Sequence, residues 1–147
     1  EGGALIGGGT EEQIARMKDY ARLLGMGFQV WDDILALTGD EKQLGKPVGN
    51  DIRNGKRTLI VLHALRVMDR NDPRRTKLTR ALGNEKATQE EIKDAIDVLH
   101  DCGAIEHARK TAQDYAAKAE EQLECLPPSA ERDFLSGLIG FAVGRKV

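Results

Sequence analysis

At 147 residues the chain is long enough for about one domain, and its apolar residues, 40% of the total, are sufficient to build a core. Lysine and arginine number 22 against 24 aspartates and glutamates, which gives a formal net charge of −2. This balance argues against a general nucleic-acid binder, which carries a basic excess or a basic face. The longest apolar runs, residues 58–65 and 134–143, are too short to span a bilayer.

The start of the chain and its two cysteines bear on where the protein is located. Glu1 is followed by GGALIGGG, an uncharged segment that lacks the basic region of a signal peptide. We interpret this opening as the interior of a longer polypeptide, with a processed N-terminus as the alternative. Cys102 and Cys125 are expected to be reduced thiols, which favours the cytoplasm.

Helix signals follow one another along the chain. Thr10 and Gln13 form a capping-box pattern, and apolar residues at helical spacing then predict one long helix over residues 11–37. Glycines and a proline predict irregular structure in the segment after it, up to about residue 50. The later helices are predicted over residues 58–68, from Asp72-Pro73, from Thr88 to Gly103, over residues 104–126 and from Ser129 onward. No strand pattern or repeat is seen, so residues 1–147 are predicted to form a single all-α domain.

Two adjacent aspartates near the end of the long predicted helix, Asp32 and Asp33, are the first candidate site residues. Gln29 precedes them by one turn, so the three side chains fall on or near one helix face. Two carboxylates at a helix C-terminus repel each other and face the negative end of the helix dipole, which destabilises the helix unless a cation compensates. Carboxylate oxygens suit Mg²⁺, which also binds phosphate groups. Taken alone, however, such a pair is more often a solvated acidic face.

The segment that follows adds two cationic candidates, Lys46 and Lys56. Lys46 lies between Gly45 and Pro47 in a constrained turn, and Lys56 follows Gly55 at the start of the next predicted helix. Free backbone amides at a helix start favour anions, and each lysine supplies a compact positive charge. A single lysine is usually a surface residue. Together with the aspartates, the two lysines predict half of a magnesium–diphosphate site.

Spacing excludes a different kind of phosphate site. A Walker loop ending at Lys46 would need glycine at position 40 and serine or threonine at position 47. The chain has Asp40 and Pro47 at these positions, and a predicted helix rather than a strand comes before them. The phosphate ligand is therefore not expected to be held by a Walker loop.

The motifs of residues 28–58 resemble the second aspartate-rich region of the trans-prenyltransferases, the polyprenyl synthetase family. They are FQxxDDIL at 28–35, TGD at 38–40, LGKPVGxDI at 44–52 and GKxT at 55–58. GALIGGGTEEQ before the long helix and FLSGLIGFAVGRK near the end are also similar to the family, so the resemblance covers essentially the whole chain. It implies the helical bundle of the isoprenoid synthases, usually a homodimer. It also implies that this chain is the C-terminal half of a short-chain synthase of the farnesyl or geranylgeranyl diphosphate type.

The resemblance further implies a reaction and a set of site residues. The family joins an allylic diphosphate head to tail to isopentenyl diphosphate, while Mg²⁺ and basic residues stabilise the charge on the departing diphosphate. Asp32 is implied to bind the metal, and Asp33 to support it directly or through water. Both aspartates and Lys46 are implied to be catalytic, and Lys46 and Lys56 are implied to bind the diphosphate. Gln29 is implied to contact the substrate, and Phe28 to form a wall of the prenyl channel. Asp51 is implied to orient a lysine or a water.

Two departures from the family pattern leave an alternative open. The second aspartate-rich motif is commonly DDxxD, and its last position here is Ala36. The family's first aspartate-rich motif, with its following arginines, is absent from the chain. The alternative is therefore a non-catalytic subunit or an incomplete fragment that needs a partner half carrying the first motif. We expect no nucleic-acid partner and no membrane span.

Overall fold

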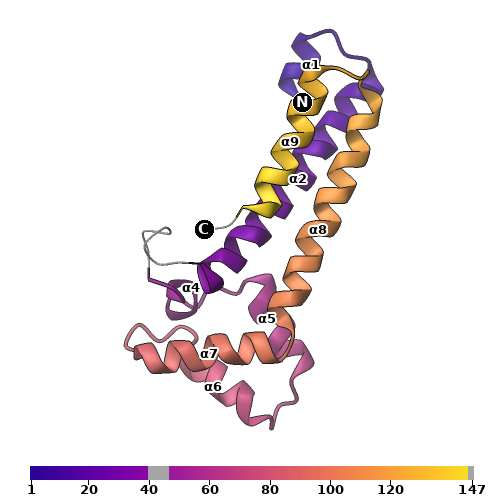
Figure 1. Ribbon diagram of the computed structural model, residues 1–147. Coiled ribbons are helices and arrows are strands. Elements are labelled where there is room, and N and C mark those ends of the chain that lie inside the picture. Colours follow the sequence, from indigo (N-terminus) through magenta and orange to yellow (C-terminus); the bar gives the residue numbers. More distant parts are fainter. Residues whose placement is uncertain (40–46, 146–147) are drawn as a thin grey trace. The chain divides into compact units, whose positions relative to one another are not determined.

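The structure is a computed structural model that describes residues 1–39 and 47–145 (Figure 1). In these ranges every regular element is a helix, which confirms the predicted all-α class. The elements are α1 (Gly2–Ile6), α2 (Glu11–Thr38), α4 (Asn50–Arg53), α5 (Leu59–Val67), α6 (Pro73–Ala81), α7 (Gln89–Asp101), α8 (Ala104–Gln122), the short 3₁₀ helix η1 (Leu123–Cys125) and α9 (Ala130–Gly144). None of the helices within the described ranges is both long enough and apolar enough to cross a bilayer.

The chain divides into two compact units. The first unit consists of Glu1–Trp31 with Thr111–Arg145, and the second unit consists of Asp32–Lys110. The helices α2 and α8 each contribute residues to both units. That the whole chain forms one domain stays a prediction.

The helix starts follow the capping signals of the sequence. At the start of α2, the Gln13 amide donates to the Thr10 hydroxyl over 3.2 Å, and the Thr10 amide donates to the Gln13 side chain over 3.0 Å. Thr88 and Glu91 make the same reciprocal pair at the start of α7, with distances of 3.2 and 2.9 Å. Both predicted capping boxes are confirmed. Single side-chain caps are present at three further predicted starts, formed by Thr58, Asp72 and Ser129.

Two short helices and one helix end were not predicted. The helix α4 has only four residues, which is too short for a helical period to show in the sequence. The helix α1 lies in the glycine-rich opening, whose composition gives no helix signal. The segment predicted as helical up to residue 126 changes to the 3₁₀ helix η1 at Leu123. The last turn of a helix often tightens in this way ahead of a proline.

The first unit has a core formed by α2, α8, η1 and α9, which Figure 1 shows in indigo, orange and yellow. Its buried residues are Tyr20, Leu23, Ala119, Leu123 and Ile139. The Tyr20 hydroxyl donates to the Leu135 carbonyl over 2.7 Å, which satisfies the polar group of a ring that is otherwise buried. Burial, with a smaller contribution from Glu120, raises the pKa of Tyr20.

In the second unit, α6 packs against α7. Leu78 of α6 and Ile92 and Leu99 of α7 are among its fully buried side chains. Ion pairs at the margin join the same helices: Arg80 to Glu91 at 3.0 Å and Lys77 to Asp94 at 3.1 Å. The two helices are therefore connected along their length by apolar and charged contacts.

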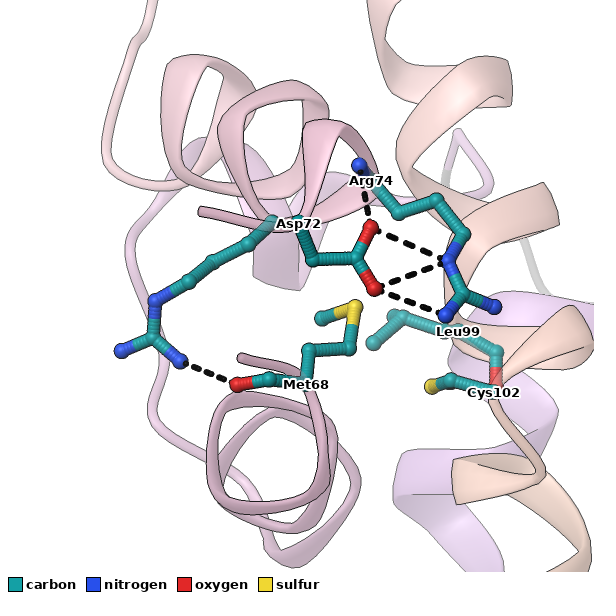
Figure 2. A network of polar contacts seen from close by, with 6 residues as sticks. Met68, Asp72, Arg74, Leu99 and Cys102 are labelled. Carbon is teal, nitrogen blue, oxygen red and sulfur yellow. Dashed lines mark hydrogen bonds and ion pairs between the residues drawn. The ribbon is translucent and has the colours of Figure 1, made fainter. Parts of the chain in front are cut away.

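The start of α6 is also fixed to the end of α5 (Figure 2). Asp72 accepts from the Arg74 amide over 2.8 Å and from the Arg74 guanidinium over 2.7 Å, so one carboxylate caps the helix and holds its first arginine. The next arginine, Arg75, donates to the carbonyls of Leu65 and Met68 at the C-terminal end of α5, over 3.2 Å in the case of Met68. These carbonyls lack partners within their own helix, so the arginine satisfies them.

Candidate functional site

Three of the predicted site residues meet in the second unit. The ammonium nitrogen of Lys56 lies 2.7 Å from Oδ1 of Asp33, in α2, and 3.1 Å from Oδ2 of Asp51, in α4. Asp33 is 8% exposed, whereas the Lys56 side chain is 46% exposed. One ammonium group therefore joins the end of α2 to α4 while remaining in contact with solvent.

The Lys56 ammonium keeps its charge and part of its hydrogen-bonding capacity. The hydrogen bond to Asp33 is the main cause that raises the pKa of Lys56; partial burial opposes the rise and Asp51 adds to it. An ammonium group has three N–H donors, and the contacts with Asp33 and Asp51 use two of them. Within the part of the chain that the structure describes, the third donor therefore remains for an anionic ligand.

The approach of the chain to this cluster depends on Gly49. Its amide donates to the Ala36 carbonyl near the end of α2 over 3.0 Å, and its φ of 78° is in the left-handed region that favours glycine. A Cβ atom added at this position would lie 2.3 Å from Cγ2 of Ile92. No side chain fits there unless the neighbouring residue moves, so glycine allows α4 to lie against α7.

A second glycine, Gly55, sets the direction of the chain between the end of α4 and Lys56. Gly55 has a φ of 68°, and the Lys56 amide that follows donates back to the Asp51 carbonyl over 2.9 Å. Gly83, in the turn after α6, approaches this turn closely and donates its own amide to the Ile52 carbonyl over 2.9 Å. Gly83 was not singled out in the sequence. A glycine just after a predicted helix is the signal of an ordinary helix end, which does not indicate a contact with residue 55.

A small pocket lies beside the cluster. Its lining residues are Asp33, Leu37, Asp51, Ile52, Lys56, Thr58 and Val61. Asp33, Asp51, Lys56 and Thr58 are the polar members of this lining, and Leu37, Ile52 and Val61 are the aliphatic ones. Thr58 is buried and uses its hydroxyl to cap α5, accepting from the Val61 amide. The pocket therefore combines charged side chains with aliphatic ones.

The remaining predicted site residues have different positions. Asp32 is half-buried in α2, next to Asp33. Lys46 lies outside the described residues. Phe28 and Gln29 belong to the first unit, where both are exposed; the guanidinium of Arg145 lies 4.5 Å from the centre of the Phe28 ring, a cation–π contact that the sequence did not indicate.

The carboxylates of the cluster are of the ligand type that a divalent cation takes. Asp33 and Asp51 supply carboxylate oxygens beside the ammonium of Lys56, and Asp32 is next to Asp33 in α2. Among the residues that the structure describes, no three acidic, histidine or cysteine side chains gather into a complete metal-binding group. Mg²⁺ fits such an incomplete set because it keeps several waters and takes further oxygens from a bound phosphate.

Proteins of known structure or function are similar to this chain over nearly its whole length. A short chain isoprenyl diphosphate synthase from Methanothermobacter thermautotrophicus is 39% identical over 144 residues, which are 98% of this chain and 43% of that protein. A geranylgeranyl pyrophosphate synthetase from Pyrococcus horikoshii is 40% identical and has a TM-score of 0.84, covering 93% of this chain and 41% of its own. A geranylgeranyl pyrophosphate synthase from Corynebacterium glutamicum, complexed with isoprenyl diphosphate and magnesium, is 29% identical and has a TM-score of 0.86, covering 98% of this chain and 41% of its own.

These matches cover most of this chain but only part of each related protein. The chain spans less than half the length of the relatives that it matches. Residues 1–99 match the family described as Polyprenyl synthetase, and this range contains the motifs of residues 28–58. The chain therefore belongs to the polyprenyl synthetase family, as its motifs implied.

Proposed function

We propose that this chain provides one side of the active site of a prenyl diphosphate synthase. The reaction is the head-to-tail condensation of an allylic diphosphate with isopentenyl diphosphate to give a short-chain prenyl diphosphate. The observation that carries the proposal is the cluster of Asp33, Lys56 and Asp51, which holds a charged donor beside carboxylates that suit a divalent cation. The names of the related synthases, and the magnesium and isoprenyl diphosphate of the Corynebacterium glutamicum complex, support it.

In this proposal Lys56 acts as a hydrogen-bond donor to the diphosphate of the allylic substrate. Its third N–H would reach a diphosphate oxygen, and the interaction strengthens as negative charge builds up on the departing group. Asp33 and Asp51 hold the ammonium in place before the substrate arrives, so little reorganisation is needed during the reaction. Lys46 is proposed as the second cationic contact of the same diphosphate.

The carboxylates are proposed to provide the metal-binding part of the site. Asp32 would hold Mg²⁺ directly, and Asp33 would support it through a bound water while it keeps its contact with Lys56. When bound, Mg²⁺ neutralises charge on the diphosphate, which makes it a better leaving group. Gln29 is proposed to contact the substrate near the reacting carbon, and Phe28 to line the path of the prenyl chain; a homodimer is the proposed assembly.

An incorporation assay on the intact protein tests this function. Isopentenyl and dimethylallyl diphosphates are supplied with Mg²⁺, and the prenyl product is measured for Asp32→Ala and Lys46→Ala. Each variant should lose about 10²–10³-fold in turnover, because each lacks a charge that stabilises the departing diphosphate. Asp19→Ala is the control, since Asp19 is an exposed aspartate of α2 that pairs with Arg22 at 3.3 Å.

Near-normal turnover in both variants would contradict the proposal. A wild-type protein that binds diphosphate but forms no product would instead assign the chain to a non-catalytic subunit.

A further inference from the structure

We propose that Gly83, in the turn between α6 and α7, is a positioning residue for Lys56. It lies 27 positions further along the chain and acts through backbone contacts rather than by touching a ligand. The inference rests on the proposed function for one point, that the ligand of Lys56 is a diphosphate. The positioning of Lys56 by Gly83 involves only contacts within the second unit.

The contact is between the backbones of two glycines. Gly55 and Gly83 both have left-handed φ values, 68° and 76°. A Cβ atom on Gly55 would lie 3.1 Å from Cα and 3.5 Å from the nitrogen of Gly83. At these distances a side chain on residue 55 would force the Gly83 backbone to move by a few tenths of an ångström, so glycine at position 55 allows the two turns to lie together as they do.

A backbone hydrogen bond holds the two turns together. The Gly83 amide donates to the carbonyl of Ile52, the fully buried residue of α4. On the other side of the same turn, the Lys56 amide donates to the Asp51 carbonyl over 2.9 Å. The carbonyls of Asp51 and Ile52 therefore hold the backbone around Gly55 in place. The position of this backbone sets the direction in which the Lys56 side chain points.

The support under this turn includes a second attachment. The Arg53 guanidinium donates to the Ala87 carbonyl over 3.3 Å and to Oε1 of Gln89 over 3.3 Å, so α4 is also tied to the start of α7. At its other end α6 is held by its Asp72 cap and by the contacts of Arg75 with the end of α5 (Figure 2). Because α6 is held at its start and packs along α7, the turn that contains Gly83 is held in a fixed position. This turn can therefore position the backbone at Gly55 and Lys56.

A matched pair of glycine variants tests the inference in the intact protein. Gly55→Ala places a Cβ against Gly83, whereas Gly103→Ala has a similar φ of 75° but no atom within 4 Å of the added Cβ. Both variants therefore carry the same kind of backbone strain, and only the first pushes against Gly83. The readout is the affinity for inorganic pyrophosphate in the presence of Mg²⁺, measured by calorimetry.

We expect Gly55→Ala to weaken pyrophosphate binding about tenfold, the loss of one charged contact, and Gly103→Ala to leave the affinity unchanged. Asparagine tolerates left-handed backbone, and a Cβ on Gly83 would lie 3.7 Å from Cα of Gly55, an ordinary contact. Gly83→Asn should therefore bind like the wild type, while Gly55→Asn should be as weak as Gly55→Ala. Equal affinities of Gly55→Ala and Gly103→Ala would overturn the inference.

A stability cycle separates this inference from the proposed function. Lys56→Met should lower the urea midpoint by the same amount in the wild type and in Gly103→Ala. In Gly55→Ala the drop caused by Lys56→Met should be less than half as large, because the contact of Lys56 with Asp33 is already weakened there. A wild type that binds no pyrophosphate would contradict the proposed function, and the stability cycle would still test whether Gly83 positions Lys56. If Lys56→Met lowered the urea midpoint of Gly55→Ala as much as that of the wild type, the inference about Gly83 would be overturned.

A milder variant covers the case in which Gly55→Ala does not fold. Arg53→Met removes the bonds to Ala87 and Gln89 without straining the backbone. It should weaken pyrophosphate binding in the same direction by a smaller factor, about threefold. An unchanged affinity in this variant would then count against the inference.

Discussion

The ammonium of Lys56 lies 2.7 Å from the carboxylate of Asp33, a side chain with only 8% of its surface exposed. A carboxylate so far removed from water needs a partner, because burying an unpaired charge is strongly unfavourable. Asp51 shares the same ammonium from the opposite element. The lysine therefore has a structural role, in the contact between α2 and α4, as well as the proposed role in diphosphate binding.

The first prediction concerns this structural role. Lys56→Met should lower the free energy of unfolding by about 1–2 kcal/mol, the range for losing a charged hydrogen bond at a partly exposed site. Chemical denaturation in urea measures the change. Lys93→Met is the control, since Lys93 is an exposed residue of α7. Equal stability of the two variants would contradict this structural role of Lys56.

The second prediction concerns Gly49 and its contact with Ile92. Gly49→Ala should lower the free energy of unfolding by about 2 kcal/mol or more, because φ is positive and the new methyl group would overlap Ile92. Gly25→Ala is the opposite case, since Gly25 lies inside α2 with nothing within 4 Å of an added Cβ. It should raise the stability by about 0.5–1 kcal/mol. A loss below about 0.5 kcal/mol for Gly49→Ala would contradict this close contact.

The third prediction is a pH dependence of stability that arises from His63. Its ring stacks on that of His107 with a centroid distance of 3.8 Å, and Nη2 of Arg66 lies 3.4 Å from its Nδ1. Burial, then His107 and Arg66, lower the pKa of His63 below 6.5. The unfolded chain therefore takes up the proton first as the pH falls, and the stability present above pH 6.5 is lost as the pH drops through the folded-state pKa.

Urea unfolding between about pH 7.5 and pH 5 tests this dependence, in a range above the titration of ordinary carboxyl groups. His63→Asn should make the curve flatter, because it removes the group whose pKa the fold lowers. Parallel curves for wild type and His63→Asn would show that the stacked pair does not carry the effect.

The fourth prediction concerns the core of the first unit. Tyr20→Phe removes the donor of the 2.7 Å bond to the Leu135 carbonyl and should lower the free energy of unfolding by about 1 kcal/mol. Tyr115→Phe is the comparison, because Tyr115 packs against the same core as a partly buried residue. Thermal or urea denaturation measures both variants. Equal effects would show that the bond to Leu135 adds nothing beyond what the ring itself contributes.

Local sequence signals account for much of the fold. Thr10, Thr88 and Ser129 each cap a helix at the predicted position, because a cap and the helical period are both properties of neighbouring residues. The family resemblance, resting on spaced motifs, is confirmed by the match over residues 1–99. The proximity of Lys56 to Asp33 and Asp51 supports the predicted grouping, although the roles of these residues stay predictions.

Contacts between distant turns could not be predicted in the same way. The pairing of Gly55 with Gly83 joins two glycines that each look like an ordinary turn residue, and no periodic pattern connects them. The contact of Arg145 with Phe28 likewise brings together residues from the two ends of the chain. Such contacts follow from tertiary packing, which a local signal does not contain. Lys46, a central residue of the prediction, lies outside the described residues.

The most direct test of the account is a crystal structure of the intact protein with Mg²⁺ and an unreactive allylic diphosphate analogue. The account predicts a diphosphate oxygen within about 3 Å of the Lys56 ammonium, with Asp33 and Asp51 still in contact with it and a magnesium ion on Asp32. A diphosphate bound away from this cluster, with Lys56 still facing solvent, would contradict it.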